Sequence, residues 1–357
     1  MGKRIAVLGA GGIGGSVGFY LSQAGHDVTL IDQWAEHVQT MQRQGLTLTD
    51  VNREATVPVK ALHLSDVSNV FEPFDIVFLS VKSYDTPWMA QLVAPHLGPG
   101  SFVLPTQNAL NDEAVAQVVG YGRTVGCVTT ISAGVYEPGH VVRTDPITTH
   151  AFDVGELHGR ITPRVREVVA MLQVIGPADG TTNIWGSRWA KLIWNSMGNA
   201  LAGLMGADTR GITPAQSDKA AMIRAVTGVE AAHVAAAMGV AIEPIRGIPG
   251  ERFATASTQA EIVALKDALE HAAGERTLTP EQLQRLGVPG RPSLLQDVIK
   301  GRRTEVDFLN GEIVRQGAAA GIATPMNAAI VELMHRVERG EVRPGLDNLA
   351  RLAPYIG

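Results

Sequence analysis

Short apolar runs alternate with longer amphipathic segments through the first half of the chain. Short apolar runs are typical of strands buried on both faces, and the longer segments repeat with the helical period. The predicted strands are Arg4–Leu8, Val28–Ile31, Asp75–Val81, Ser101–Leu104 and Thr124–Ile131, and the predicted helices are Gly14–Gln23, Trp88–His96 and Asn111–Val119. HVVRT from His140 and THAFDVG around His150 are candidates for late, antiparallel strands. The alternation predicts a parallel sheet covered by helices on both faces.

The pattern changes after about residue 183, where strand-like runs largely vanish and long segments rich in Ala, Leu and Glu follow. Three Thr-Pro pairs, which begin at Thr213, Thr279 and Thr324, predict helix starts, because the hydroxyl caps the helix and proline suits its first turn. In the first two, Gln216 and Gln282 stand at capping-box spacing. The second half is therefore predicted to be all-helical.

The best linker candidate between the two halves is GPADGTTN, Gly176–Asn183. We therefore expect an α/β protein with two domains. A Rossmann-type parallel-sheet domain would span residues 1–183, and an all-helical substrate and catalytic domain would span residues 184–357.

A glycine-rich loop joins the first strand to the first helix in RIAVLGAGGIGGSVGFYLSQAG. Gly9, Gly11 and Gly14 satisfy G-x-G-x-x-G: the first makes the tight turn, the second lets backbone approach a pyrophosphate, and the third permits close helix–strand packing. Gly12 belongs to the same predicted cofactor loop. The phosphates would lie on the amides at the helix N-terminus, so the loop predicts a dinucleotide site.

Asp32 ends the second predicted strand in VTLIDQW. An acid at this position accepts hydrogen bonds from the ribose hydroxyls of the adenosine, which favours NAD. A 2′-phosphate would meet like charge, and none of the next ten residues is an arginine. We therefore expect NAD, as NADH, to be favoured over NADP.

The helix predicted over Trp189–Leu204 contains KLIWNSMGNA, in which Lys191, Asn195 and Asn199 recur every four residues. Steps of four drift by only about 40° around a helix, so these side chains form one narrow polar row on an otherwise apolar helix. Asparagine is unfavourable inside helices, and a solvated row would usually hold Glu or Arg. A lysine withdrawn from water can give up its proton, and fixed donors beside it would stabilise charge on a carbonyl oxygen. The row therefore indicates a catalytic role.

Composition narrows the possible functions. The 357 residues are 45% hydrophobic and 18% charged with a formal net charge of −5, which is typical of a globular protein and disfavours nucleic acid as a partner. The single cysteine, Cys127, forms no internal disulfide and is expected to be a buried strand residue of a protein from a reducing compartment. The ten histidines show no metal-ligand spacing, so no metal is expected. No apolar run reaches membrane-span length, and glycines break the first run too soon for a signal peptide, so we expect a cytoplasmic protein.

Six motifs follow one another in an order that resembles the ketopantoate reductases (2-dehydropantoate 2-reductases). They are the glycine loop, DIVFLSVKSYD, the region of Asn108, GHVVRT, KLIWNSMGNA and SLLQDVIKGRRTEVDFLNG. The resemblance covers most of the chain, and its C-terminal motifs are the most specific. It implies a Rossmann domain, an all-helical domain and a site in the cleft between them, with hydride transfer from a nicotinamide to a 2-keto acid.

The resemblance also implies roles for individual residues. Lys191 is similar to the general acid that polarises and protonates the ketone oxygen. By the same resemblance, the catalytic group would be Lys191, Asn195 and Glu305, the substrate-binding group Asn199, Ser293, Asp297 and Asn108, and the cofactor side Lys82 and Asn108 as well as the glycine loop. The Asn-Gly pair that is usual in the family is Asn-Ala at Asn108 here.

Three of these residues have structural alternatives. Ser293 follows a proline and precedes an apolar run, so it is also a candidate N-cap, a role compatible with binding an anion. Asp297 is also a candidate partner for a helix dipole. Glu305 is also a candidate first residue of a new helix, because Thr304 and Asp307 resemble a capping box.

Two departures from the family weaken the assignment of the substrate. Asp32 stands where the family, which typically uses NADPH, carries a basic residue. The segment from Gly239 to Ser293 is longer than the family needs, and an extra helix predicted near Ala260–Ala273 would either cover the substrate pocket or lie at the periphery.

The first functional expectation is a dehydrogenase that acts on a 2-keto/2-hydroxy acid, such as 2-dehydropantoate in pantothenate biosynthesis. The alternative is an NAD-dependent D-2-hydroxy-acid dehydrogenase of the same fold with another substrate. A non-catalytic NAD(P)-binding sensor is disfavoured, since it has no use for the polar row. A homodimer is compatible with the sequence, which does not set the oligomeric state.

Overall fold

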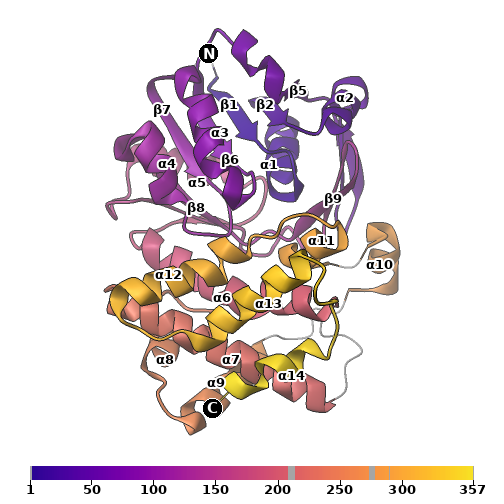
Figure 1. Cartoon of the computed structure of the whole chain (residues 1–357). Helices are drawn as coiled ribbons and strands as arrows, with labels where there is room; N and C mark the ends of the chain where they lie inside the picture. The colour runs from indigo at the N-terminus through magenta and orange to yellow at the C-terminus, as the bar shows by residue number, and fades with distance from the viewer. Residues whose placement is uncertain (1, 208–213, 273–277, 289, 357) are drawn as a thin grey trace. The chain divides into compact units, whose positions relative to one another are not determined.

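The computed structural model describes residues 2–207, 214–272, 278–288 and 290–356. The chain divides into two compact units. The first unit contains Met1–Ile184 and Thr277–Gly290, and the second contains Trp185–Arg276 and Arg291–Gly357. Every β-strand among the described residues lies in the first unit, and the second is built from helices (Figure 1). The expected α/β fold with an all-helical C-terminal region is confirmed.

A five-stranded parallel sheet forms the centre of the first unit, in the order β5-β2-β1-β6-β7. Its strands are β1 (Arg4–Leu8), β2 (Asp27–Asp32), β5 (Lys60–His63), β6 (Phe74–Leu79) and β7 (Leu97–Pro105). The strand order reverses beside β1, because the chain proceeds from β1 to β2 and β5 on one side and then to β6 and β7 on the other. Dinucleotides bind at such a switch point, outside the carboxyl ends of the strands.

Both faces of this sheet are covered by helices, as its apolar runs predict. The side chains of β1 alternate between two cores: Val7 packs in the cluster that contains Val17 of α1, and Leu8 packs in the cluster that contains Met89 of α3. One core is covered by α1 (Gly12–Gln23) and α5 (Pro163–Leu172), and the other by α3 (Thr86–Val93) and α4 (Asp112–Val119) (Figure 1).

Two smaller sheets complete the first unit. One has the order β4-β3-β10-β9 and the other the order β12-β11-β8. Their strands are β3 (Leu46–Thr49), β4 (Glu54–Val57), β8 (Val125–Thr129), β9 (Ala133–Glu137), β10 (His140–Arg143), β11 (Phe152–Glu156) and β12 (Ala178–Gly180), and α2 (Ala35–Gln44) precedes β3. The late strands are confirmed: β10 pairs antiparallel with β9, and β11 pairs antiparallel with β8. Cys127 is fully buried on β8, as expected.

The prediction of a linker over Gly176–Asn183 is wrong in its central part. Residues Ala178–Gly180 form β12, which pairs in parallel with β11. The strand is only three residues long and contains Asp179 and Gly180, which are rare in strands, so its sequence resembles a loop.

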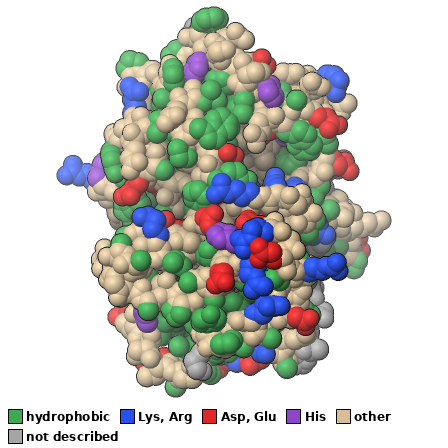
Figure 2. All heavy atoms as spheres, viewed as in Figure 1, with side chains coloured by type: hydrophobic (Ala, Val, Ile, Leu, Met, Phe, Trp, Pro, Cys, Tyr) green, Lys and Arg blue, Asp and Glu red, His purple; other side chains and the backbone are tan. Residues whose placement is uncertain are grey.

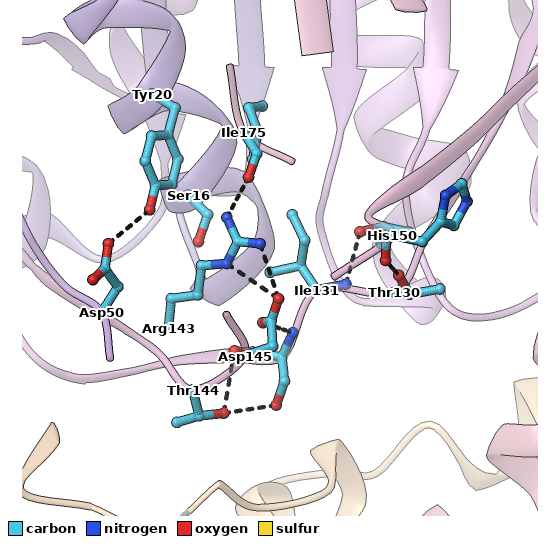
Figure 3. A network of polar contacts seen from close by, with 12 residues as sticks. Ser16, Tyr20, Asp50, Thr130, Ile131, Arg143, Thr144, Asp145, His150 and Ile175 are labelled. Carbon is cyan, nitrogen blue, oxygen red and sulfur yellow. Dashed lines mark hydrogen bonds and ion pairs between the residues drawn. The ribbon is translucent and has the colours of Figure 1, made fainter. Parts of the chain in front are cut away.

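Arg143, in the GHVVRT motif, is fully buried and organises a polar network (Figure 3). Its Nε and Nη2 donate to Asp145 Oδ2 at 3.2 and 2.9 Å, and its Nη1 donates to the carbonyl oxygen of Ile175. Its guanidinium lies 5.6 Å from the ring centroid of Tyr20 on α1, and the Tyr20 hydroxyl donates to Asp50 at 3.2 Å. Burial raises the pKa of Tyr20. The network therefore fixes the helix that follows the glycine loop.

The second unit consists of helices. They are α6 (Ile184–Met205), α7 (Pro214–Ala237), α8 (Gly250–Thr255), α9 (Gln259–Ala272), α11 (Ser293–Ile299), α12 (Asn310–Ala320), α13 (Pro325–Glu338) and α14 (Asn348–Leu352). The polar row therefore lies on a helix, as predicted, and α9 matches the extra helix predicted near Ala260–Ala273.

The Thr-Pro pairs have different outcomes. Thr279 and Gln282 form the predicted capping box at α10 (Pro280–Leu286). Pro325 begins α13 as predicted, but the Thr324 side chain makes no capping hydrogen bond. Pro214 begins α7 as predicted, but Thr213, the predicted cap, lies outside the described residues. The α13 amides of Met326 and Asn327 donate instead to the buried carboxylate of Glu230 on α7, at 2.8 and 3.0 Å.

The helix α10 packs with the first unit, although it follows most of the second unit in sequence. Leu286 joins Val51 and Val142 in a small apolar cluster, and Arg285 donates to the carbonyl oxygen of Val51 at 2.7 Å. The long segment between Gly239 and Ser293 thus supplies helices to both units: α10 to the first, and α8 and α9 to the second.

The surface mixes charges of both signs. On the face drawn in Figure 2, Lys and Arg side chains lie beside Asp and Glu side chains. Ion pairs of this kind include Arg303 with Asp307 at 3.4 Å and Arg339 with Glu341 at 2.5 Å. Within the described ranges, none of the helices is both long and apolar enough to cross a membrane.

Candidate active site

The predicted cofactor residues lie at the carboxyl edge of the parallel sheet. Gly9 follows β1, Asp32 ends β2, Lys82 follows β6 and Asn108 follows β7. These strands are neighbours in the order β2-β1-β6-β7, so the four positions line one edge. The switch point lies at the middle of this edge, where a dinucleotide is expected.

The glycine loop has the geometry that its spacing predicts. Gly9 has a φ of +89°, and a Cβ there would lie 2.9 Å from the backbone of Ser80. Both the backbone conformation and the lack of space therefore exclude a side chain at this position. A Cβ on Gly14 would lie 1.9 Å from the carbonyl oxygen of Gly9, which explains the close packing of helix and strand. A Cβ on Gly11 would meet no atom within 4 Å. The loop is therefore open at the position where a pyrophosphate would approach.

The N-terminus of α1 is suited to bind an anion. Gly11 is its N-cap residue and makes no side-chain cap, and its first turn contains no acidic residue. The first amides of such a helix are directed at whatever anion lies in front of them. Gly12 has a packing role as well, because a Cβ there would lie 2.4 Å from the carbonyl oxygen of Ala133 on β9.

Replacing Gly11 by alanine should weaken cofactor binding without loss of stability. The new methyl group would occupy the open space in front of the loop, and we expect the Kd for the dinucleotide to rise by about tenfold, the equivalent of ~1.4 kcal/mol. A fluorescence titration with reduced cofactor measures the Kd, and a thermal melt measures stability. Gly12→Ala is the matched control, since its methyl group collides with Ala133 and should lower the Tm. An unchanged Kd in Gly11→Ala would argue against phosphate binding at this loop.

Asp32 is half-buried at the end of β2 and already organises the loop. Its Oδ2 accepts from the amide of Ala10 at 2.7 Å, and its Oδ1 accepts from the amide of Trp34 at 2.8 Å. A carboxylate has about four acceptor positions, so each oxygen retains capacity for a further donor. Asp32 can therefore hold the glycine loop and accept ribose hydroxyls together.

His37 on α2 is a loop-positioning residue that the sequence analysis missed. It is 1% exposed, and its Nδ1 accepts from the amide of Gly139 at 2.7 Å. An accepting Nδ1 leaves the proton on Nε2, which lies 3.0 Å from the carbonyl oxygen of Ala10 and donates to it. The Trp34 ring stacks on the imidazole at 5.3 Å. Asp32 thus accepts from the N–H of Ala10 while His37 donates to its C=O, a relation that no local pattern reveals.

Lys82 and Asn108 are half-buried at the ends of two adjacent strands. Hydrogen bonds between the segments that follow β6 and β7 fix this region: Gln107 donates to Thr86 at 2.6 Å, and Asn111 donates to Ser83 at 3.1 Å. The structure therefore holds the two predicted cofactor-side residues on rigid, cross-linked segments.

In the second unit, α6 carries the polar row. Lys191 is half-buried, Asn195 is 5% exposed and Asn199 is 9% exposed. The opposite side of the helix is apolar and buried, with Ile193, Met197 and others in the interior. The helix therefore withdraws two carboxamides from water next to a lysine, which is an arrangement suited to a polar ligand.

Ser293 lies beside this row. Its backbone amide donates to Asn199 Oδ1 at 3.1 Å, which joins the start of α11 to α6. Ser293 does not cap the helix, because Pro292 is the N-cap residue. Its Oγ is buried and has no hydrogen-bond partner among the described residues. A buried hydroxyl without a partner costs free energy, which a ligand would recover.

Glu305 and Asp297 are both buried, but in different settings. Glu305 is 4% exposed and immediately precedes the short 3₁₀ helix η5 (Val306–Phe308), so the α-helix start considered for it is absent. Asp297 is fully buried and forms an ion pair with Arg302 at 2.6 Å. The ion pair gives Asp297 a structural role, and its role toward substrate stays a prediction.

A buried amide network behind the row was missed from the sequence. Asn310 donates to the carbonyl oxygen of Ser196 on α6 at 3.2 Å and to Asn327 at 2.9 Å, and Asn327 donates to Glu230 at 2.8 Å. Burial raises the pKa of Glu230. The network ties α6, α7, α12 and α13 together, which holds the polar row in place. The sequence feature that could have revealed this network is Asn310, a carboxamide among apolar residues in the C-terminal motif SLLQDVIKGRRTEVDFLNG.

No three His, Cys, Asp or Glu side chains in the described part of the chain are placed to hold a metal ion. The first unit offers a glycine-rich loop suited to a dinucleotide, and the second offers a row of one lysine and two carboxamides.

Comparison with known proteins agrees with these features. The family model for ketopantoate reductase PanE/ApbA matches residues 5–158, and its C-terminal model matches residues 183–338. The 2-dehydropantoate 2-reductase of Pyrococcus abyssi is 30% identical over 91% of this chain and 94% of its own length. That of Archaeoglobus fulgidus is 28% identical over 95% of this chain and 99% of its own length.

Solved structures show the same relationship. A PanE/ApbA family ketopantoate reductase from Ralstonia eutropha superposes with a TM-score of 0.72 at 26% identity, covering 95% of this chain and 99% of its own. D-mandelate dehydrogenase, solved with NADH and anilino(oxo)acetate, superposes with a TM-score of 0.74 at 25% identity, covering 94% of this chain and 99% of its own. The chain belongs to the ketopantoate reductase family, and it is an oxidoreductase that acts on CH–OH groups with a nicotinamide cofactor.

Proposed function

We propose that this enzyme transfers a hydride between a nicotinamide dinucleotide and the carbonyl carbon of a 2-oxo acid, giving a 2-hydroxy acid. The observation that carries the proposal is the polar row of α6 together with the buried, unpartnered hydroxyl of Ser293 beside Asn199. A dinucleotide-binding scaffold alone needs neither, so these residues favour an enzyme over a sensor.

Each of these residues of the second unit would contact either the substrate carbonyl group or the groups attached to it. When bound, the nicotinamide supplies the hydride. Lys191 donates a proton to the carbonyl oxygen, and the Asn195 amide stabilises the charge that develops there. Asn199 and Ser293 orient the carboxylate end, and Glu305 accepts from a substrate hydroxyl. Asp297 would support this group through its place on α11.

We infer that NADH is preferred over NADPH. The half-buried carboxylate of Asp32 stands at the end of β2, where the adenosine ribose is expected, and it has acceptor capacity for the ribose hydroxyls. A 2′-phosphate would bring about two negative charges toward it. D-mandelate dehydrogenase, which resembles this chain at a TM-score of 0.74, was solved with NADH.

The family points first to 2-dehydropantoate as the oxo acid, because the curated relatives are 2-dehydropantoate 2-reductases. The second candidate is an NAD-dependent D-2-hydroxy-acid dehydrogenase activity on another substrate. Asp32 and the likeness to D-mandelate dehydrogenase favour this second candidate.

A domain boundary near residue 183, between a dinucleotide-binding domain and a helical substrate domain, accompanies this proposal. A homodimer is proposed as the assembly, and sedimentation of the purified protein tests it.

Steady-state reduction of 2-dehydropantoate with NADH and with NADPH tests the function. We expect turnover that is faster, as kcat/KM, with NADH. Turnover of other 2-oxo acids but not of 2-dehydropantoate would select the second candidate. Absence of turnover with every 2-oxo acid and either cofactor would contradict the proposed function.

A further inference from the structure

Two guanidinium groups lie on one tryptophan of the helix that carries the polar row. The Arg246 guanidinium carbon lies 4.8 Å from the ring centroid of Trp194, and that of Arg224 on α7 lies 5.4 Å from it. Trp194 and Arg224 are half-buried and Arg246 is exposed, so this three-residue cluster is reachable from solvent. All three residues belong to the second unit.

Arg246 is held in a backbone conformation that disfavours arginine. It is the one non-glycine residue with a positive φ, +53°, among those described, and Gly247 after it has a φ of +82°. The two residues form the tip of a tight turn in which Ile245 and Ile248 exchange backbone hydrogen bonds of 2.8 and 3.0 Å. Turns with two positive φ angles strongly favour Asn, Asp or Gly. An arginine there costs backbone strain, which indicates that its side chain has a function.

Arg224 carries a buried donor that has no partner. Its Nε is shielded from solvent and makes no hydrogen bond to any described residue. Burial lowers the pKa of the Arg224 guanidinium; the carboxylate of Glu270 acts in the opposite direction, and the positive charge of Arg246 lowers it further. Glu270 is exposed on α9, so it screens this pair of cations only partly. The Arg224 Nε therefore has unmet capacity for an anion.

The cluster also stands next to the proposed proton donor. Trp194 follows Lys191 by three residues, so their side chains lie about 60° apart around α6 and about 4.5 Å apart along its axis. Gly198, one turn further, projects between the same two directions, and a Cβ there would meet no atom within 4 Å. Open space therefore adjoins the row on the side of Trp194.

We propose that Arg224, Arg246 and Trp194 bind a second carboxylate of the substrate, so that the enzyme prefers 2-oxo dicarboxylates to 2-oxo monocarboxylates. This inference rests on the second candidate of the proposed function, since 2-dehydropantoate has only one carboxylate; in it, Lys191 protonates the carbonyl oxygen and Ser293 binds the first carboxylate. Guanidinium groups recognise carboxylates in a fork geometry, and Trp194 holds their planes in place. Arg246 comes from the segment between Gly239 and Ser293, so that segment would set the substrate class.

The kinetic test compares oxo acids that differ only in the distal group: 2-oxopentanedioate with 2-oxopentanoate, and 2-oxohexanedioate with 2-oxohexanoate. The wild type should show a higher kcat/KM for the dicarboxylate of at least one pair. Arg246→Gly should lower this preference by about tenfold, and Arg224→Met should lower it as well. Arg246→Gly relieves the strained turn, so its Tm should not fall. Arg339→Gln, which removes an exposed charge from the same unit, should leave the preference unchanged.

A binding test separates this inference from the proposed function. Calorimetric titration with glutarate and with pentanoate needs no hydride transfer. We expect Arg246→Gly to weaken glutarate binding about tenfold and to change the ratio between the two ligands. If glutarate binding depends on Arg246 but the enzyme turns over no 2-oxo acid, the proposed carboxylate site is supported and the proposed function is contradicted. Two results would overturn the proposed carboxylate site and leave the proposed function standing. One is turnover of 2-oxo monocarboxylates with no preference for dicarboxylates. The other is an equal loss of affinity for glutarate and pentanoate in Arg246→Gly.

Discussion

Lys191→Ala should lower kcat for reduction of a 2-oxo acid by about 10³-fold, within the range of 10²–10⁴ typical of a lost general acid. The carbonyl oxygen gains negative charge as hydride reaches the adjacent carbon, and without Lys191 a proton would have to come from water. KM should change much less than kcat, since Asn199 and Ser293 are proposed to hold the substrate. Stopped-flow single turnovers with NADH measure the chemical step directly.

Lys191→Arg separates proton donation from charge. Arginine keeps the positive charge but does not release its proton near neutral pH, so kcat should stay close to that of Lys191→Ala. Lys219→Ala, a half-buried lysine on α7 in the same unit, is the control and should retain wild-type kcat. Wild-type kcat in Lys191→Ala would remove this residue as the general acid, and full activity in Lys191→Arg would show that only its charge matters.

Four strands of the central sheet, β1, β2, β6 and β7, could be predicted from the sequence because they are short and largely apolar, whereas the edge strand β5 is partly exposed. β1 and β6 are continuous apolar runs, and nothing else in the first half competes with that pattern. The strands β3, β4, β5, β9 and β12 were not predicted. Each has only three to five residues and contains polar residues, charged residues or glycine, so its strand conformation depends on pairing with neighbouring strands.

The glycine loop and the polar row could be predicted for a related reason: each lies within about a dozen residues of chain, and its chemistry follows from local spacing. Gly11 and Gly14 have the environments that their positions in the motif require. Contacts between distant segments gave no signal. His37 acts on Ala10 through the tertiary fold, and Glu230 caps α13 from a position about one hundred residues away.

The cluster of Arg246, Arg224 and Trp194 is the feature that the sequence alone predicts least. Its sequence, PIRGIPG, reads as a loop, and the positive φ of Arg246 follows from the bridge between Ile245 and Ile248. Only the folded turn brings this guanidinium over Trp194. A residue in a disfavoured conformation is therefore informative once the backbone is known, whereas its sequence context alone is not.

Asp32→Ser should lower the ratio of kcat/KM for NADH to that for NADPH by at least about tenfold. The wild-type carboxylate repels a 2′-phosphate and accepts ribose hydroxyls, and both effects favour NADH. Serine removes the charge but can still accept from one backbone amide. Because Asp32 also accepts from Ala10 and Trp34, we expect some loss of kcat/KM with both cofactors, and the ratio isolates the effect of the 2′-phosphate.

Asp32→Asn and Asp27→Asn complete the experiment. Asp32→Asn keeps the size of the side chain and removes its charge, so the ratio should fall as in Asp32→Ser if like-charge repulsion is the cause. Asp27 lies at the opposite end of the same strand, where it pairs with Lys60 at 2.6 Å. Its replacement removes an equal charge far from the glycine loop, and the ratio should not change. A ratio unaffected by both Asp32 variants would refute the ribose contact, whereas a fall in Asp32→Ser alone would assign the preference to hydrogen bonding rather than to charge.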